Sequence, residues 1–137
     1  MAARFVDPLK MQDWDERVLR NPDYSFFHSA AWTEVLVGSY GFRPVYLVVL
    51  DGDHFALMMP LMEVTSRLTG NRGVSLPFTD QCPPAVLQEG LFAQAVQAAV
   101  RYGEERGWKY IEWRDAGRFD NGLPASEIFY GHDVDLT

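Results

Sequence analysis

The sequence has one cysteine in 137 residues, Cys82, so no disulfide can form within the chain. A single thiol fits a reducing compartment. No apolar run approaches the roughly 18–20 residues that span a bilayer, and the first ten residues, MAARFVDPLK, lack the apolar stretch of a signal peptide. These absences predict a cytoplasmic protein without a membrane span.

Basic residues are also scarce. The chain has 12 Lys and Arg against 19 Asp and Glu, which gives a net charge of −7. Proteins grip a phosphate backbone with clustered Lys and Arg, so this composition argues against nucleic-acid binding by the chain itself. There is no repeat, no low-complexity tract and no linker-like segment, and 47% of the residues are hydrophobic. We therefore expect residues 1–137 to form a single domain.

The histidines do not form a metal-binding pattern. His28, His54 and His132 lie far apart, and none has a second His or Cys at ligand spacing, so no metal site is predicted. Cys82 would need a base and an oxyanion donor to act as a nucleophile, and the sequence shows neither. The sequence therefore assigns no catalytic residue.

Hydrophobic spacing and turn residues divide the chain into strands and helices. The expected strands are 4–6, 44–50, 55–64, 74–76, 108–113 and 128–136, and the expected helices are 11–20, 29–39 and 88–106. Residues 70–73 are expected to form a turn and 115–124 a loop. Asp51-Gly52-Asp53 predicts a tight hairpin, and Pro60 predicts a bulge or a sheet edge within its strand.

This order predicts an α/β (α+β) fold, with a mixed, mainly antiparallel sheet flanked by helices. The chain stops straight after its last expected strand, which suggests an incomplete sheet and one half of something larger. An unpaired strand 128–136 is a template for pairing with another chain. We therefore expect the chain to self-associate, most simply as a twofold dimer.

Two helices have recognisable ends and faces. Ser29 is the expected N-cap of helix 29–39, and Gly41 is the expected residue that ends it. The shared face of this helix carries Trp32, Val35, Leu36 and Ser39. The apolar stripe of helix 88–106 carries Phe92, Val96, Ala99, Val100 and Gly103.

The segment GVSLPFTDQCPPAV, residues 73–86, places polar groups and the only thiol in a loop after a core strand. Prolines on both sides lower the entropy that is lost when the loop is fixed. Such a loop, presenting Phe78, Asp80, Gln81 and Cys82, predicts a binding surface. The alternative is a structural loop that covers the core. Asp80 and Glu112 are the acid–base candidates, and Glu112 is expected to face solvent or a partner.

Several segments in succession resemble the first half of a FemA/FemB-type transferase, within the wider GNAT superfamily. They cover about residues 24–113 and read SFFHSAAW (25–32), YGFRPVYL (40–47), LMMPL (57–61), and SRLTG (66–70) running into VSLPF (74–78). Full-length relatives carry two GNAT-like halves in tandem. They transfer an aminoacyl group from tRNA to an amine of a bacterial peptidoglycan precursor, or acylate other amines.

The resemblance implies a division of labour between the halves. The acceptor amine would lie in a cleft lined partly by this first half. The tRNA end and most of the catalytic machinery would belong to the second half, so tRNA would be a partner only through that half. The chain alone would be inactive, would hold no cofactor and would not bind coenzyme A.

The match can be carried to individual residues. Trp32 matches the family's aromatic residue after a Phe-x-x-Ser entry, and Phe78, Asp80 and Gln81 fall in a loop that usually continues into a Gly-Gly-Pro-like turn. Here that turn is Cys82-Pro83-Pro84. The implied substrate-binding residues are Trp32, Phe78, Asp80, Gln81 and Cys82, with Cys82 accessible to thiol reagents.

One departure concerns the acceptor. Members that build peptidoglycan bridges commonly carry a Lys shortly after the tryptophan, where this chain has Val35 and Leu36. A more divergent branch, acting on exopolysaccharide or other cell-surface material, fits this chain better than one that takes a nucleotide-linked muramyl peptide.

Two other functions remain open. The chain could be a complete small acetyltransferase that uses acetyl-coenzyme A, or a non-catalytic interaction module with the same fold. GNAT acetyltransferases cradle the coenzyme pyrophosphate with Arg/Gln-x-x-Gly-x-Gly/Ala at the start of a helix. The nearest match, Arg67 to Gly73, has Arg72 where the backbone must approach and precedes a strand, so we interpret it as a plain turn.

Overall fold

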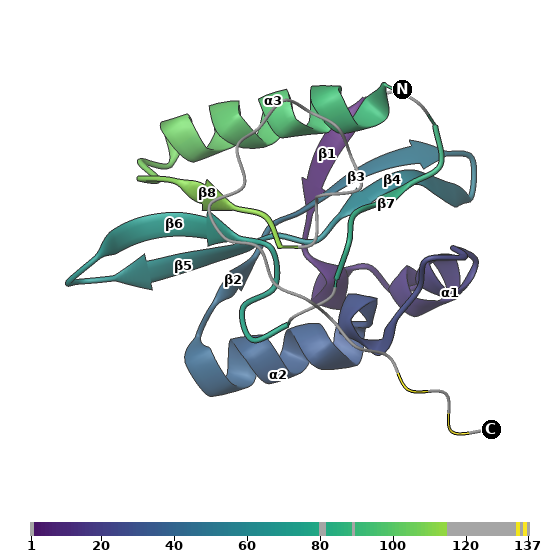
Figure 1. Ribbon diagram of the computed structural model, residues 1–137, viewed down its shortest axis with the longest axis horizontal. Helices are drawn as coiled ribbons and strands as arrows, with labels where there is room; N and C mark the ends of the chain where they lie inside the picture. Colours follow the sequence, from purple (N-terminus) through teal and green to yellow (C-terminus); the bar gives the residue numbers. More distant parts are fainter. Residues whose placement is uncertain (1, 80–81, 89, 115–133, 135, 137) are drawn as a thin grey trace.

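The computed structural model describes residues 2–79, 82–88, 90–114, 134 and 136. Figure 1 shows β-sheet between α3 on one side and α1 and α2 on the other. The helices are η1 (Pro8–Lys10), α1 (Trp14–Leu19), η2 (Phe26–His28), α2 (Ala30–Tyr40) and α3 (Leu91–Glu105). The strands are β1 (Ala3–Val6), β2 (Arg43–Pro44), β3 (Tyr46–Asp51), β4 (His54–Met59), β5 (Met62–Ser66), β6 (Gly70–Val74), β7 (Ala85–Val86) and β8 (Ile111–Glu112).

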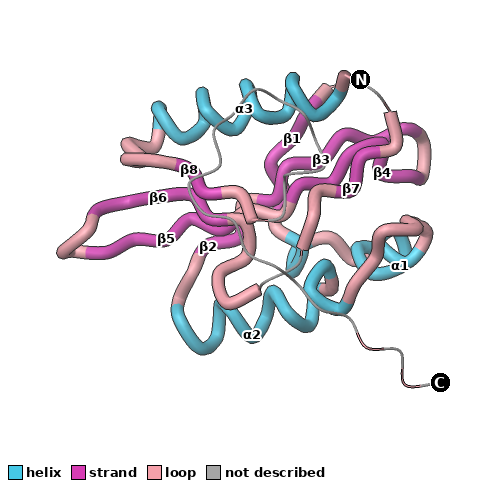
Figure 2. Tube along the Cα trace, in the orientation of Figure 1, coloured by secondary structure: helices cyan, strands magenta, loops and turns pink. Residues whose placement is uncertain are grey.

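The strands form two four-stranded sheets, in the orders β1-β3-β4-β7 and β2-β5-β6-β8. Every pair is antiparallel except β6 with β8, which is parallel. Figure 2 shows how the two sheets continue into each other across the middle of the molecule. The predicted fold class, a mixed and mainly antiparallel sheet flanked by helices, is confirmed.

The two sheets are joined where two expected strands each change partners. The strand expected at 55–64 is divided into β4 and β5 around Pro60, which has no N–H to donate to a ladder. The strand expected at 44–50 is likewise divided into β2 and β3. Val45 N donates to Leu61 O across this junction at 2.9 Å. The chain therefore passes from one sheet to the other at Pro60. The sequence had predicted only a bulge or a sheet edge at this residue.

The predicted ends of α2 and the predicted hairpin are confirmed. Ser29 accepts a hydrogen bond from Trp32 N, and Gly41 ends the helix with a positive φ of 68°. Asp51 pairs with His54 around a two-residue turn at Gly52 and Asp53. Helix α1 is shorter than the expected 11–20: it begins at Trp14, after Asp13 at its N-cap position, and ends at Leu19.

The apolar faces of α2 and α3 are only partly as expected. In α2 the buried residues are Thr33 and Leu36, whereas Val35 is 45% exposed. In α3 the buried stripe includes Leu91 and Ala95, whereas Val100 is 42% exposed. Both errors have the same cause: Val35 is adjacent in sequence to buried Leu36 and Val100 to buried Ala99, and adjacent residues point about 100° apart around the helix.

The turn expected at 70–73 is instead strand β6. The turn of this hairpin is Arg67 to Thr69, because Ser66 pairs with Gly70. Gly73 is inside the strand for a packing reason: a Cβ there would lie 2.3 Å from the Trp108 ring. Of the strand expected at 74–76, only Val74 is in a strand, as the last residue of β6, and Ser75 and Leu76 already belong to the following loop.

The expected loop 115–124 lies outside the described residues. So does most of the expected strand 128–136, of which only Val134 and Leu136 are described, both exposed. The dimer expected from that strand therefore stays a prediction, as does the single-domain organisation. No described helix is long and apolar enough to cross a membrane.

Candidate functional site

The connection between β6 and β7, residues 75–84, is here called the β6–β7 loop. It leaves one sheet at β6, which pairs with β5 and β8, and enters the other at β7, which pairs with β4. Its first residue is held to β8: Ser75 N donates to Glu112 O at 2.9 Å, and Ser75 Oγ accepts from Arg114 N at 2.7 Å. The loop thus begins where β6 and β8 stop pairing.

The β6–β7 loop contains backbone strain. Leu76 and Phe78 have φ values of 45° and 64°, a region that L-residues with bulky side chains rarely adopt. Each such conformation costs about 1–3 kcal/mol and persists only where the surroundings enforce it. Leu76 is fully buried, whereas the Phe78 residue is 59% exposed. The strain therefore holds an apolar ring out toward solvent.

Side chains from η2 and α2 fix the β6–β7 loop. Trp32 Nε1 donates to Thr79 Oγ1 at 3.2 Å. At the other end, His28 Nε2 lies 3.0 Å from Pro83 O. His28 Nδ1 accepts from Ser25 N at 3.1 Å, so Nε2 carries the proton and donates to the Pro83 carbonyl. Both contacts join residues about fifty positions apart in the sequence.

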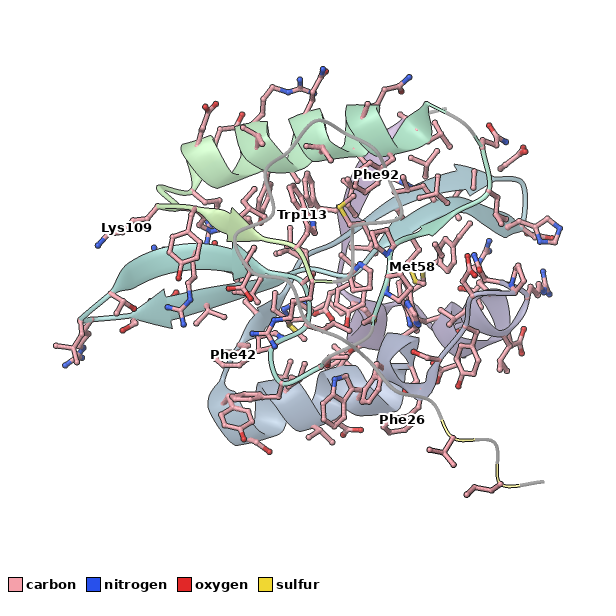
Figure 3. All side chains as sticks on the ribbon, viewed as in Figure 1. Phe26, Phe42, Met58, Phe92, Lys109 and Trp113 are labelled. Carbon is pink, nitrogen blue, oxygen red and sulfur yellow. The ribbon has the colours of Figure 1, made fainter. Side chains whose placement is uncertain are left out.

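An aromatic surface lies along α2 next to this loop. We use this name for Phe26, Phe27, Trp32, Tyr40, Phe42 and Phe78. Phe26 and Phe27 pack on Trp32, with ring centroids 5.9 and 5.3 Å away. Tyr40 lies between Phe42 and Phe78, with centroid distances of 5.4 and 4.6 Å. Figure 3 shows Phe26 and Phe42 near opposite ends of α2.

The aromatic surface brings together two of the predicted site residues, Trp32 and Phe78, through Thr79. Asp80 and Gln81 lie outside the described residues. Cys82 is 1% exposed and packs in the core cluster that contains Trp14 and Tyr46, so the expectation of an accessible thiol is wrong. Burial of a small, weakly polar thiol is favourable. The polar residues that precede Cys82 in the sequence, Asp80 and Gln81, had instead suggested an exposed loop position.

Sequence reasoning missed Tyr40, Phe42, Thr79 and His28 as parts of this region. One available signal was the composition of α2, AAWTEVLVGSY, which has a single charged residue, Glu34. A helix that is apolar nearly all round is usually covered on both sides. Its inner side packs on the core, and its outer side carries exposed Val35 and Tyr40.

The acidic side chains near β8 are engaged in ion pairs. Glu112 Oε1 accepts from Arg114 Nε at 2.8 Å. Glu63, which the sequence did not single out, is buried and accepts from Arg106 at 2.7 and 2.9 Å and from Trp108 Nε1 at 2.7 Å. The hydrogen bonds from Arg106, and then that from Trp108, lower the pKa of Glu63 against the opposing effect of burial. Glu63 is thus held ionised as a structural anchor.

Gly90 precedes α3, so the start of this helix can be compared with the coenzyme cradle motif, and its residues fit that motif poorly. Gly90, with a φ of 81°, precedes the helix and no side chain caps it. Leu87 and Phe92 stand where the cradle motif needs Arg or Gln and a second small residue. Gln88 donates instead to Asp51, and no Lys or Arg occurs between residues 82 and 93.

Two further features bear on binding. A hollow of about 350 Å³ is lined by Arg4, Val6, Asp7, Lys10, Met11, Val48 and Leu50. None of these belongs to the aromatic surface or the β6–β7 loop, so this hollow is not the expected acceptor cleft. Within the described part of the chain, no three His, Cys, Asp or Glu side chains are grouped to hold a metal ion.

No known family profile and no curated protein sequence matches the chain. Solved structures match it in shape. A ribosomal-protein-alanine N-acetyltransferase from Brucella melitensis biovar Abortus is 10% identical, with a TM-score of 0.61 over 99% of this chain and 100% of that chain. An aminoglycoside antibiotic 6'-N-acetyltransferase from Acinetobacter haemolyticus is 13% identical, with a TM-score of 0.57 over 98% and 100%.

A third match is a GNAT family acetyltransferase from Staphylococcus aureus, which is 8% identical, with a TM-score of 0.59 over 97% of this chain and 98% of that chain. At such identities the likeness shows the fold alone. The chain therefore has the fold of GNAT acetyltransferases, and its chemistry has to be argued from its own residues.

Proposed function

We propose that this chain is the acceptor-binding, GNAT-type first half of a FemA/FemB-like N-acyltransferase. The whole enzyme would transfer an acyl or aminoacyl group to an amine of a cell-envelope precursor. The observation that carries the proposal is the β6–β7 loop, which is strained at Leu76 and Phe78, fixed by Trp32 and His28, and exposes the Phe78 ring. Strain that keeps an apolar ring in solvent is a pointer to binding.

The proposal that the acyl donor is bound by another half of the enzyme rests on the start of α3. A helix start with one glycine and no Lys or Arg between residues 82 and 93 gives little support for a pyrophosphate. The donor would therefore be held by a second GNAT-like half, and tRNA, if it is the donor, would be bound only there. Asp80 and Gln81, which follow Phe78 and Thr79 in the sequence, are proposed to contact the acceptor together with Trp32 and Phe78.

A second candidate is a complete small N-acetyltransferase that uses acetyl-coenzyme A. The observation that favours it is length: the chain matches solved acetyltransferases over 98–100% of their own chains. The two candidates differ in the expected binding of the coenzyme. Calorimetry with coenzyme A and acetyl-coenzyme A should give no binding if the first candidate is right, and micromolar binding would overturn it in favour of the second.

Acceptor binding is tested directly by tryptophan fluorescence with an oligosaccharide that carries a free amino group, and with a muramyl peptide that ends in a lysine amine as the less favoured acceptor. Phe78→Gly keeps the backbone conformation and removes the ring, and it should weaken binding at least about tenfold if one buried aromatic contact is lost. Leu87→Ala, an exposed residue outside the aromatic surface, is the matched control. Equal affinity of the parent and Phe78→Gly would contradict the proposed site.

A further inference from the structure

Three cations belong to the β5–β6 hairpin of this acidic protein or lie against it: Arg67 in its turn, Arg72 in β6 and Lys109 beside Gly70. We call Arg67, Arg72 and Lys109 the basic hairpin end. The sequence has no acidic residue between Glu63 and Asp80. Figure 3 shows the Lys109 side chain at the end of the sheet from which this hairpin extends. The cluster is notable because the chain as a whole has a net charge of −7.

Backbone contacts bring Lys109 to this hairpin. Lys109 N donates to Asn71 O at 2.9 Å. The Lys109 side chain then lies against Gly70, where a Cβ would be 2.6 Å from Lys109 Cε and 3.1 Å from Nζ. Because Gly70 has no side chain, the ammonium group reaches the hairpin turn. Arg72 Nη1 donates to Thr69 Oγ1 at 3.0 Å, which also folds its guanidinium back toward the turn.

The other arginines of this sheet have carboxylate partners. Arg43 and Arg106 pair with Glu63, and Arg114 pairs with Glu112. In the described part of the chain Arg67, Arg72 and Lys109 have none. Among the nearest acids along the chain, Glu63 and Glu112 pair with the other arginines, and Glu104 and Glu105 are exposed at the end of α3 without an ion pair to these three cations in the described chain. Adjacent like charges repel, so an anion bound among them would be favourable.

A tyrosine accompanies these charges. Gly73 pairs with Ile111 in the parallel ladder, and Gly73 N donates to Tyr110 O at 3.2 Å. Tyr110 thus lies beside β6 and directly follows Lys109 in the sequence. Tyr110 is 52% exposed. Exposed aromatic rings beside basic groups are a platform on which nucleobases stack.

We propose that the basic hairpin end binds the phosphates of a nucleotide and that Tyr110 stacks on its base. A nucleoside diphosphate carries the multiple negative charge that three unpaired cations can balance, and an arginine fork matches phosphate oxygens. The contacts would come from side chains on strands and not from backbone N–H groups at the start of a helix. The inference is independent of the proposed acyl transfer.

The test is an NMR titration of the whole chain, followed at individual amides, with ADP. Separate titrations use pyrophosphate and adenosine, which represent the phosphate and nucleoside parts of ADP. ADP should shift the amide resonances of residues 67–73 and 108–111 in a saturable way. Added salt should weaken the binding of ADP. Arg72→Gln and Lys109→Gln should each lower the affinity for ADP about tenfold, which is the loss expected for one charge-assisted hydrogen bond. Tyr110→Leu should lower the affinity for ADP and leave the affinity for pyrophosphate unchanged.

Arg101→Gln is the matched control, because it removes an exposed charge from α3 that has no ion pair in the described chain. It should bind ADP like the parent, and each variant's spectrum should show an intact fold. A four-nucleotide RNA distinguishes the source: tighter binding than ADP assigns the site to RNA, and equal or weaker binding assigns it to a free nucleotide. No saturable shift with ADP or RNA, or equal loss in Arg101→Gln, would overturn the proposal.

Discussion

At the scale of single residues, Phe78 carries the most information. Its φ of 64° suits glycine, so the usual order of glycine and alanine should be reversed there. We expect Phe78→Gly to be more stable than Phe78→Ala by about 1 kcal/mol, since a Cβ in this region is strained. Urea unfolding of both variants measures the difference. If the alanine variant is as stable or more stable, residue 78 is not held in this conformation.

Cys82 gives a second residue-scale prediction. Because it is 1% exposed, its thiol should react with an aromatic disulfide reagent at a rate limited by opening of the structure. We expect labelling in native buffer to be at least about a hundredfold slower than in urea, as for a site protected by several kcal/mol. Rapid labelling of the native chain would contradict the burial.

The sequence could identify some residues of the site and not others, for a physical reason. Of the two predicted site residues that the structure brings to one surface, Trp32 came from the resemblance to FemA/FemB-type sequences and Phe78 from its place in a loop between prolines. The burial of Cys82 and the bond from His28 to Pro83 depend on residues far apart in the chain. The spacing of residues within one segment of the sequence cannot predict such long-range contacts.

At the scale of elements, Glu63 ties β5 to the end of α3. Its pKa is lowered in the folded chain, so it stabilises the fold at pH values above its ordinary 4.5, and this contribution is lost as the pH falls through the folded value. Glu63→Gln should therefore lower Tm at pH 7 and flatten the decline of Tm below pH 4.5. Thermal melts between pH 7 and 3 measure this.

Glu112→Gln is the matched control for Glu63. The Glu112 side chain is 41% exposed, and among the described residues its ion pair is with Arg114, two positions on, so its removal should change Tm little. If Glu63→Gln and the control behave alike, the ion pairs of Glu63 do not hold the sheet and helix together.

The packing of Trp108 on Gly73 and Gly103 gives another element-scale prediction. A Cβ would lie 2.3 Å from the ring at Gly73 and 2.8 Å at Gly103. Gly73→Ala should therefore cost about 1–3 kcal/mol or more, as overpacking does. Gly38→Ala, in an open part of α2, should instead stabilise by about 0.5–1 kcal/mol. Chemical unfolding of the two variants compares them, and equal effects would contradict the Trp108 contact.

Elements were predictable from the sequence to the extent that their signals were local. The caps of α2 and the β3–β4 hairpin follow from Ser29, Gly41 and Gly52, whose roles depend on neighbouring residues. The split at Pro60 and the strand β6 did not follow. A proline reports a missing donor but not which sheet comes next, and Gly73 is needed for a ring from 35 positions further on.

At the scale of the whole molecule, the chain has the fold of GNAT acetyltransferases, and the two surfaces proposed for binding differ in chemistry. The aromatic surface along α2 is nearly uncharged, whereas the basic hairpin end is cationic within a chain of net charge −7. The expected self-association remains a prediction. If it occurs through apolar contacts, light scattering should show the dimer strengthening with salt, because screening weakens the repulsion of two acidic copies. A monomer at all salt concentrations would contradict it.

The strained β6–β7 loop also has a consequence for the order in which the chain folds. No local preference draws Leu76 and Phe78 into positive φ, so their conformation waits until Trp32 and His28, 47 and 55 positions before their partners, are in place. Closing such long loops is slow compared with forming a hairpin. The β3–β4 hairpin and α2 would therefore assemble early, and the loop that presents Phe78 would be among the last segments to become ordered as the chain leaves the ribosome.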